Sequence, residues 1–141
     1  MTLAAAVAVH VAGLALTVPH GWHIDRSRTN CDPVQLLVVS SAPIRARVRD
    51  DGTLAGPPPG AVEIFLLEDH LNDPRNEPRR PRRFAWKEPH PLEGCCGTPS
   101  APGATYWFRF RGRLLIYMVY AGRGVTPQRR AQTLRLLDSL R

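Results

Sequence analysis

The segment Thr105-Tyr-Trp-Phe-Arg-Phe-Arg-Gly-Arg-Leu-Leu-Ile-Tyr-Met-Val-Tyr-Ala121 decides the fold of this 141-residue chain. In residues 105–111, aromatic side chains alternate with largely basic ones, which is the period-two pattern of a strand with one buried face. Residues 113–121 are apolar on both faces, as in a central strand or a strand covered by a helix. Gly112 marks the turn between the two runs, so the segment predicts an antiparallel hairpin.

The sequence that follows this hairpin predicts one helix running to the last residue. Thr126 suits the N-cap position and Pro127 suits the first helical position. Apolar residues recur with helical spacing at Ala131, Leu134, Leu137 and Leu140, and Leu136 widens the stripe. We expect this stripe to pack across the sheet and the basic residues off the stripe to stay in water, namely Arg129, Arg130, Arg135 and Arg141.

Short apolar runs elsewhere predict further strands, at residues 14–18, 22–25, 34–40, 61–68 and, at a sheet edge, 84–86. Prolines and glycines separate these runs, so long irregular connections are expected between them. The predicted fold is a single α+β domain over residues 13–141. It consists of an antiparallel β-sheet of about five to seven strands with the C-terminal amphipathic helix packed on one face.

Residues 1–12 are treated as a separate apolar segment, because Thr2 to Val18 contains no charged residue. Three interpretations remain open for this run. It forms part of the first strands, which the alternation of Val7, Val9 and Val11 favours. Alternatively, it is the remnant of a signal or membrane anchor that starts upstream, or it is a signal as it stands.

Several short stretches are similar to small actinobacterial proteins of unknown function. They are Leu16-Thr-Val-Pro-His-Gly-Trp22, Cys31-Asp-Pro33, Pro81-Arg-Arg-Phe84, Leu92-Glu-Gly-Cys-Cys96 and the terminal Leu136-Leu-Asp-Ser-Leu-Arg141. More loosely, the strand followed by Pro, Gly and Trp and the terminal helix resemble PsbP-like α/β/α sandwiches. The first of these resemblances, to the actinobacterial proteins, covers roughly residues 13–141 and implies a fold. It brings no activity, cofactor or catalytic residue.

The chain is strongly basic, with a formal net charge of +7. Of its 19 basic residues, all but Lys87 are arginines, and together with the abundant Ala, Pro and Gly this bias is typical of GC-rich coding. The charge therefore predicts weak, salt-sensitive adhesion to polyanions or to an anionic envelope surface rather than a dedicated nucleic-acid protein.

Two basic features nevertheless form a candidate polyanion site. A proline-interrupted arm carries Arg75, Arg79, Arg80, Arg82 and Arg83. One face of the strand at 105–111 carries Trp107, Arg109 and Arg111. Arginine and aromatic side chains on a sheet can contact phosphates and stack bases. A cytosolic nucleic-acid-binding protein that uses the arm is therefore an alternative, and a solvated loop whose arginine stems cover apolar surface is the simpler interpretation.

The three cysteines are candidates for a disulfide. An odd count in a short chain allows one bridge and one free thiol. A bond from Cys31 to Cys95 or Cys96 would close a loop of roughly 65 residues and contribute roughly 2–4 kcal/mol. It would persist only in an oxidising compartment. Three reduced cysteines that serve only packing are the alternative.

Neither a metal site nor a catalytic site is predicted. A zinc site from His23, Cys31 and the two neighbouring cysteines matches no zinc-binding spacing. Adjacent cysteines are not the Cys-x-x-Cys pattern of redox enzymes, and no helix is expected to start at them. Glu68-Asp69-His70 is the tightest acid–base cluster, but it is also an ordinary polar strand end.

These observations predict a non-enzymatic accessory or binding module of unknown ligand, with no cofactor. The apolar N-terminus and the expected disulfide favour the cell envelope or the extracellular space, and the cytoplasm is the alternative. A small metal- or thiol-dependent enzyme is the second functional alternative. The sequence leaves partners and oligomeric state unspecified.

Overall fold

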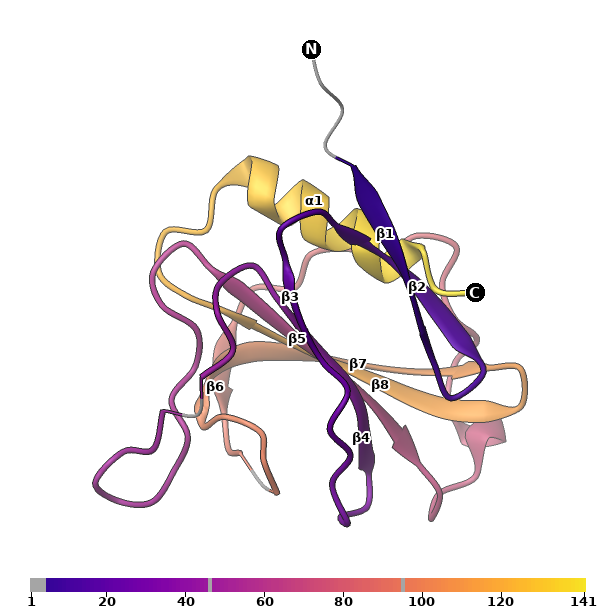
Figure 1. The fold of residues 1–141 in the computed structure, drawn as a ribbon. Helices are drawn as coiled ribbons and strands as arrows, with labels where there is room; N and C mark the ends of the chain where they lie inside the picture. Colours follow the sequence, from indigo (N-terminus) through magenta and orange to yellow (C-terminus); the bar gives the residue numbers. More distant parts are fainter. Residues whose placement is uncertain (1–4, 46, 95) are drawn as a thin grey trace.

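The computed structural model describes residues 5–45, 47–94 and 96–141. In these residues, one α-helix, α1 (Pro127–Asp138), packs against antiparallel sheets (Figure 1). Six strands form the main sheet in the order β3-β4-β5-β8-β7-β6, and β1 and β2 form a separate two-stranded sheet. The predicted α+β class and the C-terminal helix are confirmed. The single sheet of five to seven strands is wrong, because the described residues form two sheets with eight strands in all.

The β7–β8 hairpin lies inside the main sheet, as its sequence predicts. The six strands of that sheet are β3 (His23–Asp25), β4 (Val34–Ser40), β5 (Val62–Asp69), β6 (His90–Leu92), β7 (Ala101–Phe110) and β8 (Arg113–Ala121). Arg111 and Gly112 connect β7 to β8 with φ angles of 53° and 72°. Two successive positive φ angles give a tight turn that matches the twist of the paired strands.

The predicted edge strand at residues 84–86 is wrong, because the outer strand at this side of the sheet is β6. Phe84 is 5% exposed, and its ring packs edge-on against Tyr106 and Tyr117. Its backbone N–H donates to the Asp138 side chain at 2.7 Å. The segment is therefore fixed by aromatic packing and by the end of α1 rather than by strand pairing.

The buried face of α1 is rotated from the predicted stripe. Its buried residues are Thr133, Leu136, Leu137 and, just beyond the helix, Leu140. Ala131 is exposed and Leu134 is only partly buried. Thr133 can be buried because its hydroxyl donates to the carbonyl of Arg129 at 2.8 Å. The N-cap is as predicted, since the Thr126 side chain accepts from the Arg129 N–H at 3.1 Å.

Two arginines of α1 contact tryptophan rings instead of lying wholly in water. The Arg129 guanidinium lies 5.6 Å from the ring centre of Trp22, and that of Arg130 lies 5.3 Å from the ring centre of Trp86. Both distances are within the range of a cation–π interaction. Arg135 and Arg141 are exposed, as expected. The first turn of the helix is thus anchored by two tryptophan rings, from Trp22 and Trp86, which lie far apart in the sequence.

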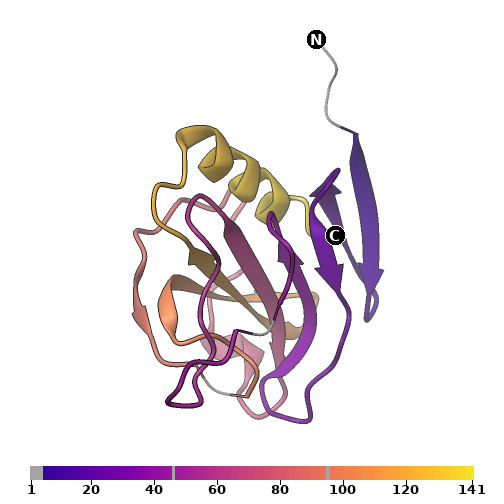
Figure 2. The same cartoon turned by 60° about the vertical axis from the view of Figure 1, so that its left-hand side comes forward.

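The small sheet pairs β1 (Ala6–Val11) with β2 (Leu14–Pro19) and stands beside the helix (Figure 2). The structure therefore forms a strand in the apolar N-terminal run, of which residues 1–4 lie outside the described part. The last residue of the chain joins this sheet, because Arg141 exchanges two backbone hydrogen bonds with Ala15, at 2.7 and 3.0 Å. Both ends of the described chain thus close the same side of the core.

The two faces of the main sheet are covered differently. The helix face packs under α1 and the β1–β2 hairpin and contains the larger hydrophobic cluster. The opposite face, here called the loop face, contains Val38, Phe65 and Ile116 and lies under irregular segments at 41–60 and 93–100. The second helical layer implied by the PsbP-like resemblance is therefore not found in the described residues. No helix in that part of the chain is long and apolar enough to cross a membrane.

Candidate functional site

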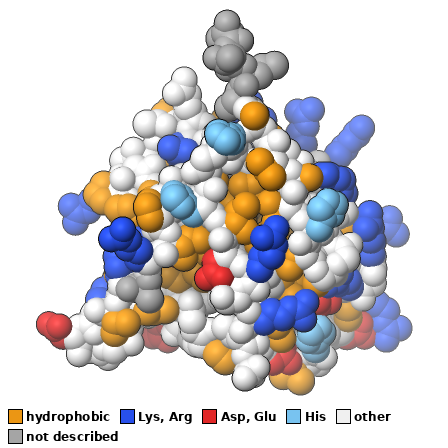
Figure 3. All heavy atoms as spheres, in the orientation of Figure 1, with side chains coloured by type: hydrophobic (Ala, Val, Ile, Leu, Met, Phe, Trp, Pro, Cys, Tyr) orange, Lys and Arg blue, Asp and Glu red, His pale blue; other side chains and the backbone are white. Residues whose placement is uncertain are grey.

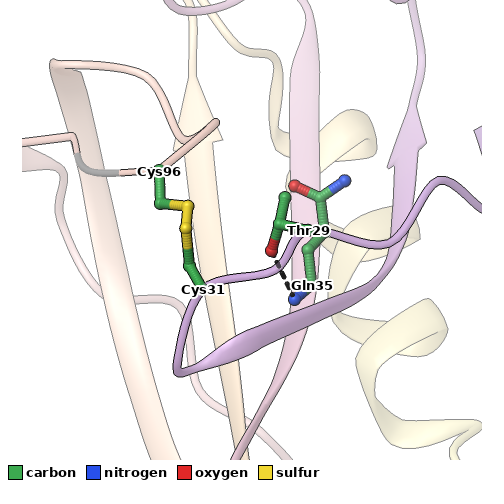
Figure 4. The surroundings of a disulfide bond; sticks show 4 residues. All are labelled: Thr29, Cys31, Gln35 and Cys96. Carbon is green, nitrogen blue, oxygen red and sulfur yellow. Dashed lines mark hydrogen bonds between the residues drawn. A yellow bond between two sulfur atoms is a disulfide. The ribbon is translucent and has the colours of Figure 1, made fainter.

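A disulfide joins Cys31 to Cys96, whose Cα atoms are 6.2 Å apart (Figure 4). Cys31 lies just before β4, and Cys96 lies in the 93–100 segment that covers the loop face. The bond ties that segment to the sheet, as predicted for the pair of Cys31 with one of the adjacent cysteines. Cys95 lies outside the described residues.

The disulfide uses two of the cysteines considered as zinc ligands in the sequence, Cys31 and Cys96. Thiolates bind zinc, and sulfurs bonded to one another are not thiolates. In the described residues, no group of three or more His, Cys, Asp or Glu side chains is arranged to hold a metal ion. His20 follows β2 and His23 begins β3, and both are exposed. His23 pairs with Ser40, at the end of β4 opposite to Cys31.

The Glu68-Asp69-His70 cluster is occupied by contacts that hold the fold together. Arg113 donates to both Glu68 carboxylate oxygens, at 2.7 and 2.8 Å, and also to the carbonyl of Ala12 at 2.7 Å. Hydrogen bonds from Arg113 hold the pKa of the Glu68 carboxyl below its usual value. Asp69 accepts from the N–H groups of the two residues after His70, at 2.8 and 3.0 Å. These carboxylates bind a strand end, a hairpin turn and a loop to one another.

The proline-rich arm lies against the end of β7 and forms a basic hollow with it. Arg79 and Arg109 are bridge partners, and the Arg109 N–H donates to the Pro78 carbonyl at 2.8 Å. The hollow has a volume of about 490 Å³ and is lined by Arg79, Arg80, Arg109, Phe110, Arg111 and Gly112. The structure thus brings together four of the arginines predicted as polyanion-binding residues.

The four arginines of this basic hollow have different roles. Arg80 donates to the backbone carbonyls of Asp138 and Leu140, so its charge is used at the carboxyl end of α1. Arg111 lies over the Phe110 ring at 4.8 Å. Arg79, Arg109 and Arg111 form no ion pair with an acidic residue in the described part of the chain. Three guanidinium groups therefore remain for an external anion.

The other predicted polyanion residues lie outside the hollow. Arg75 pairs with Asp73 at 2.9 Å, and Arg82 and Arg83 are exposed further along the arm. Trp107 is 41% exposed, but it lies in a neighbouring hollow beside the acidic Asp73 and Glu77. Trp107 therefore lines a different hollow from that lined by Arg79, Arg109 and Arg111. Figure 3 shows Lys and Arg side chains spread over the face in view, with acidic side chains also present on it.

A second candidate site is a polar cavity on the loop face, with a volume of about 200 Å³. Its polar lining comprises Asp25, Gln35, Arg45, Arg47 and Glu63, and its apolar lining includes Val38, Ile44, Leu54, Phe65 and Pro99. Glu63 is the second residue of β5 and Gln35 the second residue of β4, and each is 6% exposed. Because the two strands are antiparallel and Glu63 pairs with Ser40, these polar side chains line opposite ends of the cavity.

The polar groups of this cavity are incompletely paired. In the described residues, no hydrogen bond or ion pair reaches the Glu63 carboxylate, and the buried Nε of Arg47 has no partner. Burial raises the pKa of the Glu63 carboxyl, and the positive charge of Arg47 offsets part of that rise. Gln35 donates its side-chain NH₂ to the Ser27 carbonyl at 3.1 Å, and its side-chain oxygen can act as an acceptor.

The sequence interpretation did not identify this cavity. The available signal was Glu63 inside the apolar run Ala61-Val-Glu-Ile-Phe-Leu-Leu67, together with Gln35 inside Val34-Gln-Leu-Leu-Val-Val39. Charged or amide side chains on buried central strands need a partner, so such positions point to an internal site. Arg45 and Arg47 gave no signal, because they belong to an arginine-rich connecting segment.

Comparisons with known proteins return no match: no protein family, curated protein or solved structure is similar to this chain at a significant level.

Proposed function

We propose that this chain is a non-enzymatic binding module associated with the cell envelope, and that its basic hollow binds an anionic envelope polymer. The observation that carries the proposal is the set of three guanidinium groups, from Arg79, Arg109 and Arg111, gathered around one hollow without acidic partners in the described residues. A polymer with carboxylate or phosphate groups supplies the matching charges.

The disulfide supports the proposed location. A bond between Cys31 and Cys96 is consistent with an oxidising environment outside the cytoplasm, because reducing systems keep cytosolic thiols reduced. Nucleic acid is scarce there, whereas acidic polymers are common components of envelopes. The compartment thus favours an envelope polymer among the polyanions that the charge of the chain allows.

The neighbourhood of Trp107 also favours an envelope polymer over nucleic acid. Single-stranded nucleic acid binds where exposed rings lie within a basic channel. Here the exposed ring of Trp107 lies beside Glu77, whose charge repels phosphates, and beside Asp73, whose charge is offset by Arg75. The Phe110 ring at the basic hollow is instead covered by Arg80 at 5.4 Å and by Arg111.

The proposal is tested by measuring binding of the oxidised protein to a poly(glycerol phosphate) and to polygalacturonate over a range of salt concentrations. The variant R79Q/R111Q removes two exposed charges from the hollow, and R82Q/R83Q removes two exposed charges from the arm outside it. We expect the first variant alone to lose affinity for at least one polymer, with the salt slope reduced by about one per lost contact. Equal losses in both variants, or binding to neither polymer, would contradict the proposal.

A further inference from the structure

The polar cavity on the loop face has the features of a built small-molecule site, distinct from the basic hollow. Most buried polar groups in a folded protein are hydrogen-bonded, because leaving them unpaired is costly. Glu63 is only 6% exposed, and no hydrogen bond from the described residues reaches its carboxylate. Glu63 lines the cavity, so a hydrogen-bond donor inside the cavity can reach its carboxylate.

The charges around the cavity are balanced but separated. Glu63 and Arg47 both line it, yet no ion pair forms between them in the described part of the chain. Arg45 adds a second positive charge and Asp25 a second negative one. Because each sign has unused hydrogen-bonding capacity, the best complement is a small molecule that carries one ammonium and one carboxylate.

The remaining walls set the size and polarity of the rest of the ligand. Val38, Phe65 and Ile44 are apolar, so a short aliphatic group is favoured over a polar one. The volume of about 200 Å³ is smaller than that of sites for drug-sized ligands, which begin at about 300 Å³. A molecule the size of an aliphatic amino acid satisfies both limits.

The wall formed by the 93–100 segment is fixed in place by the disulfide. Gly97 and Pro99 follow Cys96 directly and line the cavity. A Cβ atom added at Gly97 would lie 3.8 Å from the Gln35 side-chain oxygen, so the segment passes close over this acceptor. The oxidised chain therefore presents a preformed cavity, which lowers the entropic cost of binding.

We propose that this cavity binds a small zwitterion of the α-amino acid class, with its ammonium group on Glu63 and its carboxylate on Arg47. The proposal does not depend on the basic hollow, because the two sites share no lining residue.

The test is a titration of the oxidised, full-length ¹⁵N-labelled protein with glycine, L-alanine, L-valine and L-leucine, followed by amide chemical shifts. We expect saturable shifts at Gln35, Glu63 and Gly97, and stronger binding of the aliphatic members than of glycine. Isobutylamine and isovalerate, which each carry one of the two charges of valine, should bind at least roughly tenfold more weakly than valine.

Variants separate the proposed contacts from general effects of charge. E63Q keeps the size of the side chain and should weaken binding by roughly tenfold or more, since it removes a charge-assisted hydrogen bond. R47Q should do the same for the carboxylate end. E88Q removes an exposed carboxylate outside the cavity and should change nothing. Binding of none of the four amino acids, or unchanged binding in E63Q, overturns the proposal and leaves water as the occupant.

Discussion

The two faces of the main sheet differ in how their polar groups are satisfied. On the helix face, Tyr117 is fully buried and its hydroxyl donates to the Leu137 carbonyl at 3.1 Å. Tyr106 donates to the Ala85 carbonyl at 2.9 Å and accepts from the Lys87 N–H at 3.1 Å. On the loop face, Glu63 has no such partner in the described residues. Pairing on the helix face is also incomplete, because in the described residues the buried Nε1 of Trp86 and Nε of Arg130 have no partner. The loop face differs in that its unpaired carboxylate lines a cavity.

The covering elements explain this difference. A helix satisfies its own backbone and presents a uniform apolar surface, so the helix face can be sealed by Leu136, Leu137 and an aromatic cluster. Irregular segments such as 41–60 and 93–100 leave uneven space and bring polar side chains to it. In this chain the internal binding capacity lies under the loops, and the disulfide holds one of them in place.

The largest expected effect comes from shortening a buried side chain on the helix face. Leu137 is 0% exposed, and L137A should lower the free energy of unfolding by about 2–5 kcal/mol, because it leaves a cavity in a closely packed core. Urea unfolding followed by tryptophan fluorescence measures the change. L54A, in the only partly buried wall of the loop-face cavity, should cost much less. Equal losses would show that the two faces are equally well packed.

Reduction of the disulfide should affect the loop face. Losing the bond between Cys31 and Cys96, which are 65 residues apart, should lower the free energy of unfolding by about 2–4 kcal/mol, because the unfolded chain gains freedom. Thermal unfolding with and without reductant measures this effect. The variant C95S should show the same response to reductant as the parent chain, whereas C96S should show none. If the stability of the parent chain does not change with reductant, the disulfide does not fix the 93–100 segment over the cavity.

The smallest expected effect is a gain in stability from E63Q. Burial raises the pKa of the Glu63 carboxyl above its usual 4.5, so the folded chain binds this proton more tightly than the unfolded chain does. The ionised carboxylate therefore destabilises the fold at pH above the raised pKa, and this cost disappears as the pH falls through it. E63Q should be more stable than the parent by about 1 kcal/mol or less at pH 7, with the difference shrinking toward pH 4.5.

The pH dependence of E63Q is measured by urea unfolding at several pH values in the absence of added amino acids. A variant less stable than the parent at pH 7 would mean that the carboxylate is already well satisfied, as the Tyr106 and Tyr117 hydroxyls are. A stabilising substitution that also weakens binding is the usual sign of a site kept for function rather than for stability.

Local features of the fold were well predicted, because neighbouring residues encode them. The β7–β8 turn, the Thr126 N-cap and the strands β4 and β5 follow from alternation, glycine and capping side chains. The orientation of α1 was not, because Leu134 and Ala131 fit a helical stripe as well as Thr133 does. The orientation also depends on the rings of Trp22 and Trp86, which are distant in sequence and contact Arg129 and Arg130 of the helix.

The candidate sites divide in the same way. The order of residues along the chain indicated a basic arm and a bridge from Cys31 to one of two adjacent cysteines. It did not indicate that Arg75 is paired with Asp73, that Arg80 is bound to the end of α1, or that Arg79 meets Arg109 and Arg111. Each of these facts depends on which segment lies beside β7.

Residue order along the chain was enough to give the α+β class, the central hairpin, the terminal helix and the charge that attracts polyanions. The hairpin and the helix arise from interactions between residues close in sequence, and the net charge is the sum of all charged side chains. The free arginines, the pairing of Cys31 with Cys96 and the cavity around Glu63 required the fold. Pairing and burial join residues far apart in sequence, and a residue type carries no record of the partner that it will meet.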